Sequence, residues 1–200
     1  MVVWSKLDMS VKLDTGEKNP EMISNRSFRF MALSMRIHDF LSPFIEKRIR
    51  QFGIEKGMIV IDYGCGPGRY TTKLAECVGN KGKVYALDIH ELAIKTIRRK
   101  IEKYNLKNIE PILIDGYNST LPDKTADIVC AIDMFPGIKK PTDLLKEIRR
   151  ITKKDGILII DGWHETRNHQ LPRSVIQKIL DSEIWEIIEQ TFDHLKCKPR

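Results

Sequence analysis

Short apolar runs alternate with helical patterns from residue 58 onward. Most runs are rich in β-branched residues and end at a turn or a polar residue. Runs that are apolar on both faces are typical of buried parallel strands. We expect five such strands, at Met58–Asp62, Lys83–Asp88, Ile109–Ile114, Ile128–Ile132 and Ile157–Ile160. The segments between them place apolar residues at three- and four-residue steps, as in Ile94, Ile97, Ile101 and Tyr104 and again in Leu144, Ile148 and Ile151. This spacing predicts helices with one buried stripe, and the alternation indicates βαβ units around a parallel sheet.

The two ends of the chain follow other patterns. Up to Asn19-Pro20 the sequence is polar, whereas apolar residues keep helical spacing from Ser27 to Phe52, with an interruption at Ser42-Pro43. Serine is a favoured N-cap and proline a favoured first helical residue, so we expect two helices here. After the fifth strand the pattern predicts a helix over 171–182 and two closing strands over 185–190 and 193–198.

Composition is that of one globular domain in a reducing compartment. The chain has 200 residues, 42% of them apolar, and 34 Lys+Arg against 27 Asp+Glu give a net charge of +7. Most of this charge falls on predicted helices, which favours solvated helix faces over an RNA-binding stripe. Cys65, Cys77, Cys130 and Cys197 are far apart, and the N-terminus lacks a secretory pattern. We therefore expect a cytoplasmic protein. No apolar run approaches the roughly 18 residues of a membrane span.

A glycine-rich loop follows the first predicted strand. It reads D-x-G-x-G-x-G, with Asp62, Gly64, Gly66 and Gly68. Glycines at such a place let the backbone turn tightly and approach a ligand closely. A dinucleotide fingerprint needs a small residue where Arg69 stands, and a phosphate-binding loop needs a Gly-Lys-Ser/Thr triplet that does not occur. Nicotinamide, flavin and nucleotide-hydrolysis sites are therefore disfavoured.

The loop resembles the first motif of class I S-adenosylmethionine-dependent methyltransferases. Matching motifs extend from about Met58 to Ile160, and acidic residues end three further strands, at Asp88, Asp115 and Asp133. The resemblance implies a three-layer α/β fold, with helices on both faces of a mostly parallel seven-stranded sheet and an N-terminal helical cap. Ligands of open parallel sheets bind at the carboxyl ends of the strands, which is where these acidic residues fall.

The same resemblance implies a cofactor site. S-adenosylmethionine would be the cofactor and S-adenosylhomocysteine the product, with Asp88 accepting hydrogen bonds from the two ribose hydroxyls. Asp115 would meet the adenine amino group, Ile89 would pack against the adenine ring, and Asp62 would lie near the methionine amino group. The full expected set is Asp62, Gly64, Cys65, Gly66, Gly68, Asp88, Ile89, Asp115, Gly116 and Asp133.

Structural roles compete with some of these assignments. Asp62 could instead serve as a structural cap. Asp88 could serve as the N-cap of the helix that begins near Leu92. Asp115 precedes a glycine, and Asp-Gly is also a turn signal. Cys65 is interpreted as a small buried loop residue.

The acceptor side is expected on the N-terminal segment and after the fourth and fifth strands. We expect residues 1–52 to form an extension and helical lid, and 53–200 to form the cofactor-binding domain. Phe28, Met31, Met134 and Phe135 are the candidate substrate contacts, and Asp133 or His164 is the candidate group that takes a proton from the acceptor. The spacing of the five histidines suggests no metal site.

Methyl transfer to a small, partly apolar acceptor is the function that the sequence favours. The motifs are most similar to the branch that includes ubiquinone and menaquinone biosynthesis C-methyltransferases. RNA or protein methylation is the alternative that the charge of +7 encourages, although Asp133-Met134-Phe135-Pro136 departs from the D/N-P-P-Y/F motif of amino-methylating nucleic-acid enzymes. A non-catalytic module that binds S-adenosylmethionine is an alternative of another class. The sequence predicts no oligomeric state.

Overall fold

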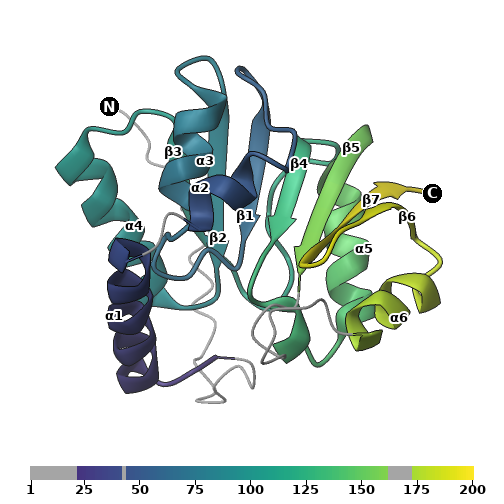
Figure 1. Cartoon of the computed structure of the whole chain (residues 1–200), viewed down its shortest axis with the longest axis horizontal. Coiled ribbons are helices and arrows are strands. Elements are labelled where there is room, and N and C mark those ends of the chain that lie inside the picture. Colours follow the sequence, from purple (N-terminus) through teal and green to yellow (C-terminus); the bar gives the residue numbers. More distant parts are fainter. Residues whose placement is uncertain (1–21, 42–43, 162–172) are drawn as a thin grey trace, which may run out of the picture.

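Seven strands form one sheet in the order β3-β2-β1-β4-β5-β7-β6 (Figure 1). The computed structural model of the protein describes residues 22–41, 44–161 and 173–200. The first five strands pair in parallel, whereas β7 is antiparallel to both β5 and β6. The strands are β1 (Ile59–Tyr63), β2 (Lys83–Asp88), β3 (Ile109–Leu113), β4 (Ala126–Ala131), β5 (Thr152–Asp161), β6 (Trp185–Gln190) and β7 (His194–Pro199). The expected mostly parallel, seven-stranded sheet is confirmed.

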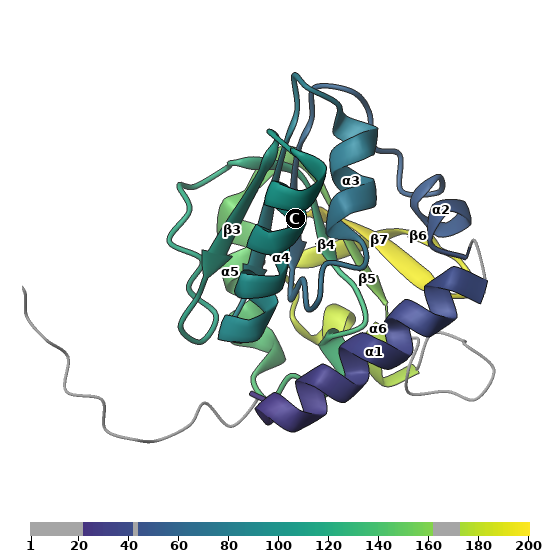
Figure 2. The same ribbon diagram turned by 90° about the vertical axis from the view of Figure 1, so that its left-hand side faces the viewer.

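Helices cover both faces of this sheet (Figures 1 and 2). They are α1 (Asn25–Leu41), α2 (Phe44–Ile49), α3 (Thr71–Val78), α4 (Glu91–Tyr104), α5 (Pro141–Ile151) and α6 (Arg173–Asp181), with a 3₁₀ turn η1 at Phe135–Gly137. One core cluster lies between the sheet and α5 and α6, and the other between the sheet and α2, α3 and α4. Figure 2 shows α1 crossing the end of the sheet where β4 and β5 terminate.

Successive residues of a strand enter opposite cores. Val60 packs in the cluster under α3 and α4, and its neighbour Ile61 packs in the cluster under α5. Both residues are fully buried. Side chains of a strand point alternately to the two faces, so a strand buried on both sides must be apolar throughout. This explains why continuous apolar runs located the strands.

β5 begins earlier than the apolar pattern predicts. The strand starts at Thr152, five residues before the expected Ile157, and its first part contains the polar sequence Lys153-Lys154-Asp155. Pairing with β4 extends the strand, because Thr152 pairs with Ala126 before a register shift between Ala126 and Ile128. Backbone pairing of this kind does not depend on apolar side chains.

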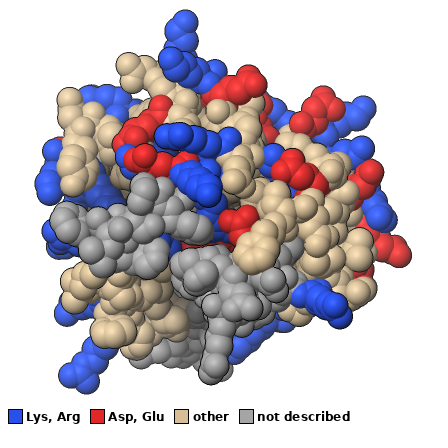
Figure 3. Space-filling view, in the orientation of Figure 1, with Lys and Arg blue, Asp and Glu red and all other residues tan. Residues whose placement is uncertain are grey.

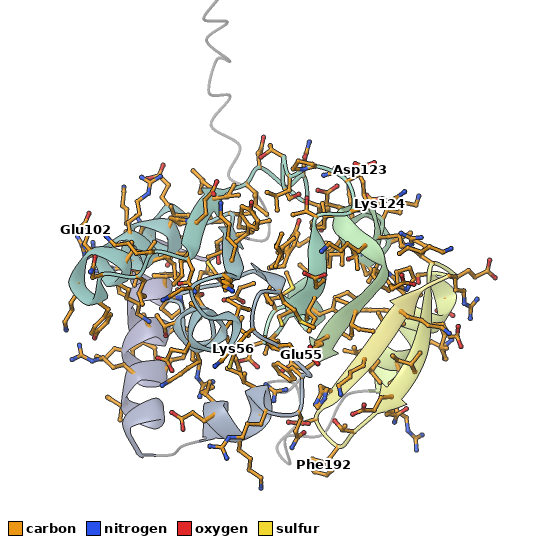
Figure 4. All side chains as sticks on the ribbon, turned by 90° about the horizontal axis from the view of Figure 1, so that it is seen from above. Glu55, Lys56, Glu102, Asp123, Lys124 and Phe192 are labelled. Carbon is orange, nitrogen blue, oxygen red and sulfur yellow. The ribbon has the colours of Figure 1, made fainter. Side chains whose placement is uncertain are left out.

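The amino ends of the strands lie opposite the site described below. Figure 4 looks onto this end, where Glu55 and Lys56 precede β1, and Asp123 and Lys124 precede β4. The predicted interruption between two N-terminal helices is confirmed by the end of α1 at Leu41 and the start of α2 at Phe44. Ser42 and Pro43 lie outside the described residues. No helix in the described part of the chain is long and apolar enough to cross a membrane.

Candidate cofactor and acceptor site

A cavity of about 290 Å³ lies at the carboxyl ends of the parallel strands. Its walls come from the segments that follow four strands and from α1. The lining residues are Gly64, Cys65, Gly66, Pro67, Arg69 and Tyr70 after β1; Asp88, Ile89 and His90 at and after β2; Ile114, Gly116 and Tyr117 after β3; Ile132, Asp133, Met134, Gly137 and Ile138 after β4; Phe28, Met31 and Met35 of α1; and Met22, Ile23, Asp62 and Tyr63.

The glycine loop after β1 forms one wall of the cavity. Gly64 and Gly66 both have positive φ, at +76° and +51°, a region that favours glycine. The Gly64 N–H donates to the Leu87 carbonyl over 2.8 Å, which holds the loop against the end of β2. A Cβ on Gly64 would lie 3.0 Å from the Met134 side chain, whereas a Cβ on Gly66 would meet nothing within 4 Å. The loop is therefore open to a ligand at Gly66.

Gly68 has a different role from the other two glycines. It does not line the cavity. A Cβ on Gly68 would lie 2.3 Å from Ile97 Cδ1 of α4, so the missing side chain lets the loop pack against that helix. This packing gives Gly68 a structural role, and its cofactor contact stays a prediction.

Asp88 holds the glycine loop through one hydrogen bond, and each of its carboxylate oxygens can accept another. Its Oδ2 accepts from the Gly66 N–H over 2.8 Å, and its Oδ1 accepts from the His90 N–H over 2.7 Å. Burial raises the pKa of this carboxyl, although the two backbone donors oppose the shift. Each carboxylate oxygen can accept a second hydrogen bond, so Asp88 can still receive two hydroxyls. The geometry fits the expected ribose contact.

Asp62 is buried at the end of β1 and lines the cavity. Its Oδ2 accepts from Thr71 Oγ1 over 2.5 Å, which ties β1 to the first residue of α3. Burial raises the pKa of Asp62 to about 7, against the opposing effect of the Thr71 hydrogen bond. The structural role weighed for this residue is therefore present, and its place in the wall is compatible with a cofactor contact as well.

His90 joins the cofactor side of the cavity to α1. Its Nδ1 accepts from the Leu92 N–H over 3.1 Å and caps α4, so His90, not Asp88, is the N-cap of this helix. The ring stacks on Phe28 of α1 with 4.5 Å between centroids. Among the described residues, its buried Nε2 has no hydrogen-bond partner. With Nδ1 accepting, the neutral ring presents Nε2 as a donor.

Sequence reasoning missed this residue. The available signal was a histidine two positions after the acidic end of a strand, immediately before a helical pattern. A small polar side chain is the usual N-cap, so this sequence pattern does not mark a histidine as the cap of the helix.

Arg48 of α2 is the centre of a buried polar cluster. Its Nε donates to Asp193 Oδ2 over 2.8 Å, its Nη1 donates to the Tyr70 hydroxyl over 2.7 Å, and its Nη2 pairs with Asp161. Only 2% of Arg48 is exposed. The charge pattern favours solvated helix faces for the basic residues, and that interpretation is wrong for Arg48. Charge pattern alone did not distinguish it from exposed Lys47 and Arg50.

The same cluster positions Asp133 at the end of β4. The Asp133 N–H donates to Asp161 Oδ1 over 2.6 Å, and its backbone has a positive φ of 60°. Arg48 Nη1 lies 3.8 Å from one carboxylate oxygen of Asp133, and Arg69 Nη1 lies 3.5 Å from the other. Asp133 thus lines the cavity as part of a network that extends from α2 to β5.

Besides Gly68, two further predicted site residues do not line the cavity. Phe135 is fully buried in the core cluster under α5 and α6, with Lys178 Nζ 5.8 Å from its ring centroid, so the predicted substrate contact is corrected to a core role. Asp115 is exposed and pairs through its backbone with Asn118, which is the turn that its Asp-Gly sequence also allowed. Gly116 does line the cavity. His164 lies outside the described residues.

The rest of the wall is largely apolar. Phe28, Met31 and Met35 contribute one side from α1, and Met134 and Ile138 contribute another after β4. Three of the four predicted substrate contacts, Phe28, Met31 and Met134, are therefore in the wall. The cavity has a polar end at the strand termini and an apolar side beneath α1.

Comparison with known proteins identifies the family. The sequence model of a family described as "Methyltransferase domain" matches residues 54–195. The chain belongs to this methyltransferase family. The expected membership among class I S-adenosylmethionine-dependent methyltransferases is confirmed. A solved S-adenosylmethionine-dependent methyltransferase from Aquifex aeolicus superposes with a TM-score of 0.71 at 27% identity, over 78% of this chain and 89% of that one.

Curated relatives include methyltransferases of two kinds. A demethylmenaquinone methyltransferase from Geobacillus stearothermophilus is 32% identical over 111 residues, which are 56% of this chain and 47% of that protein. This chain therefore spans about half of that relative's length. A probable cobalt-precorrin-6B C(15)-methyltransferase (decarboxylating) from Saccharolobus solfataricus is 34% identical over 154 residues, covering 73% of this chain and 76% of that protein.

Proposed function

We propose that the protein transfers a methyl group from S-adenosylmethionine to a small, partly apolar acceptor. The observation that carries this proposal is one cavity whose polar end holds Asp88 and the open Gly66 backbone, and whose other side is apolar. Membership of the methyltransferase family and the names of the two curated relatives, both of which refer to small-molecule substrates, support it. S-adenosylmethionine supplies a methyl group activated by its sulfonium and leaves as S-adenosylhomocysteine.

The cofactor would be held by residues at the ends of β1 and β2. Asp88 accepts the ribose hydroxyls at the two free positions of its carboxylate, and Ile89 packs against the adenine ring. Asp62, buried behind the glycine loop, faces the ammonium group of the methionine part. A charged donor at that place would favour the ionised form of Asp62, whose pKa burial raises to about 7.

The acceptor would lie under α1, beside Met31 and Met134. These side chains and Phe28 exclude water and hold the acceptor in line with the methyl group, so that the bound geometry lowers the barrier to displacement. Residues 1–52 act as the lid in this proposal. Asp133 is the candidate that takes a proton, because it lines the cavity and its backbone is fixed by Asp161. We propose no metal in this reaction and a cytoplasmic location, which the four free cysteines fit.

The first test is calorimetric titration with S-adenosylmethionine and S-adenosylhomocysteine. Asp88→Ala should abolish saturable binding, whereas Asp123→Ala, which changes an exposed aspartate at the opposite end of the sheet, should leave it unchanged. NADH serves as a competing ligand. Binding of NADH, or equal binding by Asp88→Ala and the unaltered protein, would overturn the cofactor assignment.

Turnover separates the enzyme from the other candidates. Formation of S-adenosylhomocysteine with demethylmenaquinone as the acceptor is the expected result, because one curated relative is named for that substrate. Cofactor binding without turnover on any small acceptor would favour a non-catalytic binding module. Methylation of tRNA or rRNA that weakens steeply with salt would favour the nucleic-acid alternative instead.

A further inference from the structure

The outer face of α1 carries an exposed apolar stripe. Phe30, Leu33 and Ile37 are 75%, 56% and 55% exposed. They recur at three- and four-residue steps, so they lie on one side of the helix. The residues of α1 that line the cavity form a second stripe on the opposite side, about 160° away at 3.6 residues per turn. Packing onto the protein therefore explains the inner stripe and leaves the outer one unexplained.

Basic side chains accompany the outer stripe. Arg26, Arg29 and Arg36 are all exposed, and none forms an ion pair with any residue that the structure describes. No acidic residue occurs between positions 22 and 38. In Figure 3 the lower part of the region where Figure 1 draws α1 is tan with blue at its edge. At 100° per residue, Arg29 and Arg36 lie along one edge of the outer stripe, and Arg26 lies within its arc near the start of the helix.

We propose that α1 docks the protein on the surface of an anionic phospholipid bilayer. Helices that lie in a membrane interface combine apolar residues, which enter the boundary between headgroups and acyl chains, with Lys or Arg that contact anionic headgroups. Phe30, Leu33 and Ile37 provide the first element here. The three arginines provide the second, and each basic residue near an anionic surface strengthens attachment.

A bilayer fits these observations better than a protein partner does. The remaining large apolar residues with high exposure in the described chain, such as Leu113, Ile188 and Phe192, come from different elements. Single exposed apolar residues are ordinary on protein surfaces. Among the residues that the structure describes, only α1 combines a stripe of three such residues with three exposed arginines, two of them along one edge of the stripe. Asp39, near the end of α1, is the one acidic residue of the helix, so over positions 22–38 the charge is purely positive and matches a negative surface.

Docking of this helix would also place the cavity next to the membrane. The same helix faces the bilayer on one side and lines the cavity through Phe28, Met31 and Met35 on the other. A helix with its side chains is about 10 Å thick, so only one helix would separate the two. An apolar acceptor could then enter from the lipid phase; this step rests on the proposed function, whereas docking itself does not.

Vesicle flotation with the full chain tests the proposal. The protein is mixed with phosphatidylcholine vesicles, with or without about 30% phosphatidylglycerol, at low and high salt. Binding is expected only to the anionic vesicles and should decrease at high salt, because salt screens the arginines. The variant Phe30→Ser/Leu33→Ser/Ile37→Ser should bind at least about tenfold more weakly, and Arg26→Gln/Arg29→Gln/Arg36→Gln should lose the preference for anionic lipid.

A matched control removes exposed apolar side chains elsewhere. Phe192→Ser/Ile188→Ser alters the β6–β7 region, where Figure 4 labels Phe192, and should bind vesicles as the unaltered protein does. Absence of vesicle binding, or equal binding by the α1 triple serine variant, would overturn the proposal. A dimer in size-exclusion chromatography that the triple serine variant converts to monomer would assign the stripe to a second copy instead.

Cofactor titration keeps this test separate from the proposed function. All variants should bind S-adenosylhomocysteine, which also shows that they fold. Cofactor binding without vesicle binding would remove the membrane proposal and leave the methyltransferase proposal intact. Vesicle binding by a protein that binds no cofactor would remove the methyltransferase proposal and leave the membrane proposal intact.

Discussion

Replacing Arg48 with methionine should strongly destabilise the fold. Arg48 is 2% exposed, its guanidinium pairs with Asp161 and Asp193, and its Nη1 also donates a hydrogen bond to the Tyr70 hydroxyl. Removing one partner of a buried ion pair leaves the other charge uncompensated, and the loss is about 3–5 kcal/mol of unfolding free energy. For a domain of this size, that loss corresponds to a decrease of about 10 °C in the melting temperature.

The pH dependence of this loss identifies its cause. Burial raises the pKa of Asp161, and Arg48 opposes that shift in the unaltered protein. Without Arg48 the folded-state pKa of Asp161 rises further, so native Asp161 keeps its proton at a pH where the unfolded chain has released it. Stability then falls as pH rises between the unfolded and folded pKa values, by up to about 1.4 kcal/mol per pH unit. The deficit of Arg48→Met should therefore be larger at pH 8 than at pH 6.

Urea denaturation followed by circular dichroism at pH 6, 7 and 8 measures both effects. Arg50→Met is the matched control, because Arg50 is exposed two residues further along and should change stability by less than about 0.5 kcal/mol. In Arg48→Met/Asp161→Asn the more deeply buried of the two stranded carboxylates loses its charge, so this double variant should be more stable than Arg48→Met alone. A single variant as stable as the unaltered protein, or a double variant with no recovery, would refute the electrostatic explanation.

Three further outcomes follow from contacts in and behind the cavity. Gly68→Ala should lower the unfolding free energy by about 1–3 kcal/mol in a melting experiment, because its Cβ would meet Ile97 at 2.3 Å; Gly53→Ala, which has a similar φ and nothing within 4 Å, controls for backbone strain. Affinity for S-adenosylhomocysteine should fall about tenfold from pH 8 to pH 6 in calorimetry as Asp62, whose pKa burial raises to about 7, takes up a proton. A pH profile unchanged in Asp62→Asn would count against that contact. Phe28→Ala should remove the stacking of α1 on His90 and speed proteolysis within α1. Phe30→Ala, which changes an exposed residue of the same helix, should leave the cleavage rate unchanged. Equal cleavage rates in the two variants would show that the Phe28–His90 stack does not hold α1 on the protein.

The central strands and the residues at their carboxyl ends could be predicted because the sequence patterns that mark them are local. A continuous apolar run followed by Asp62 and a glycine loop is readable within a dozen residues, and Asp88 ends the next run in the same way. The observed cavity places both residues where these patterns indicated. Local chemistry is sufficient when neighbours in sequence are also neighbours in the site.

The buried cluster could not be predicted in this way. The hydrogen-bond partners of Arg48 are 22, 113 and 145 residues away, so nothing near it in the sequence marks it as buried. Phe135 illustrates the same limit at short range. An aromatic residue beside Asp133 is compatible with either the cavity wall or the core, and the 3₁₀ turn that begins at Phe135 decides between them. Side-chain direction in an irregular turn depends on tertiary packing.

The division of the cavity between two stretches of chain has an evolutionary consequence. The residues matched by the family model begin at position 54, yet Phe28, Met31 and Met35 of the wall come from α1, before that point. Mutation or recombination in this short N-terminal stretch can remodel one side of the chamber while the glycine loop and Asp88 stay unaltered. Under the proposed function, such changes would alter the acceptor that the chain methylates and leave its cofactor-binding residues unchanged.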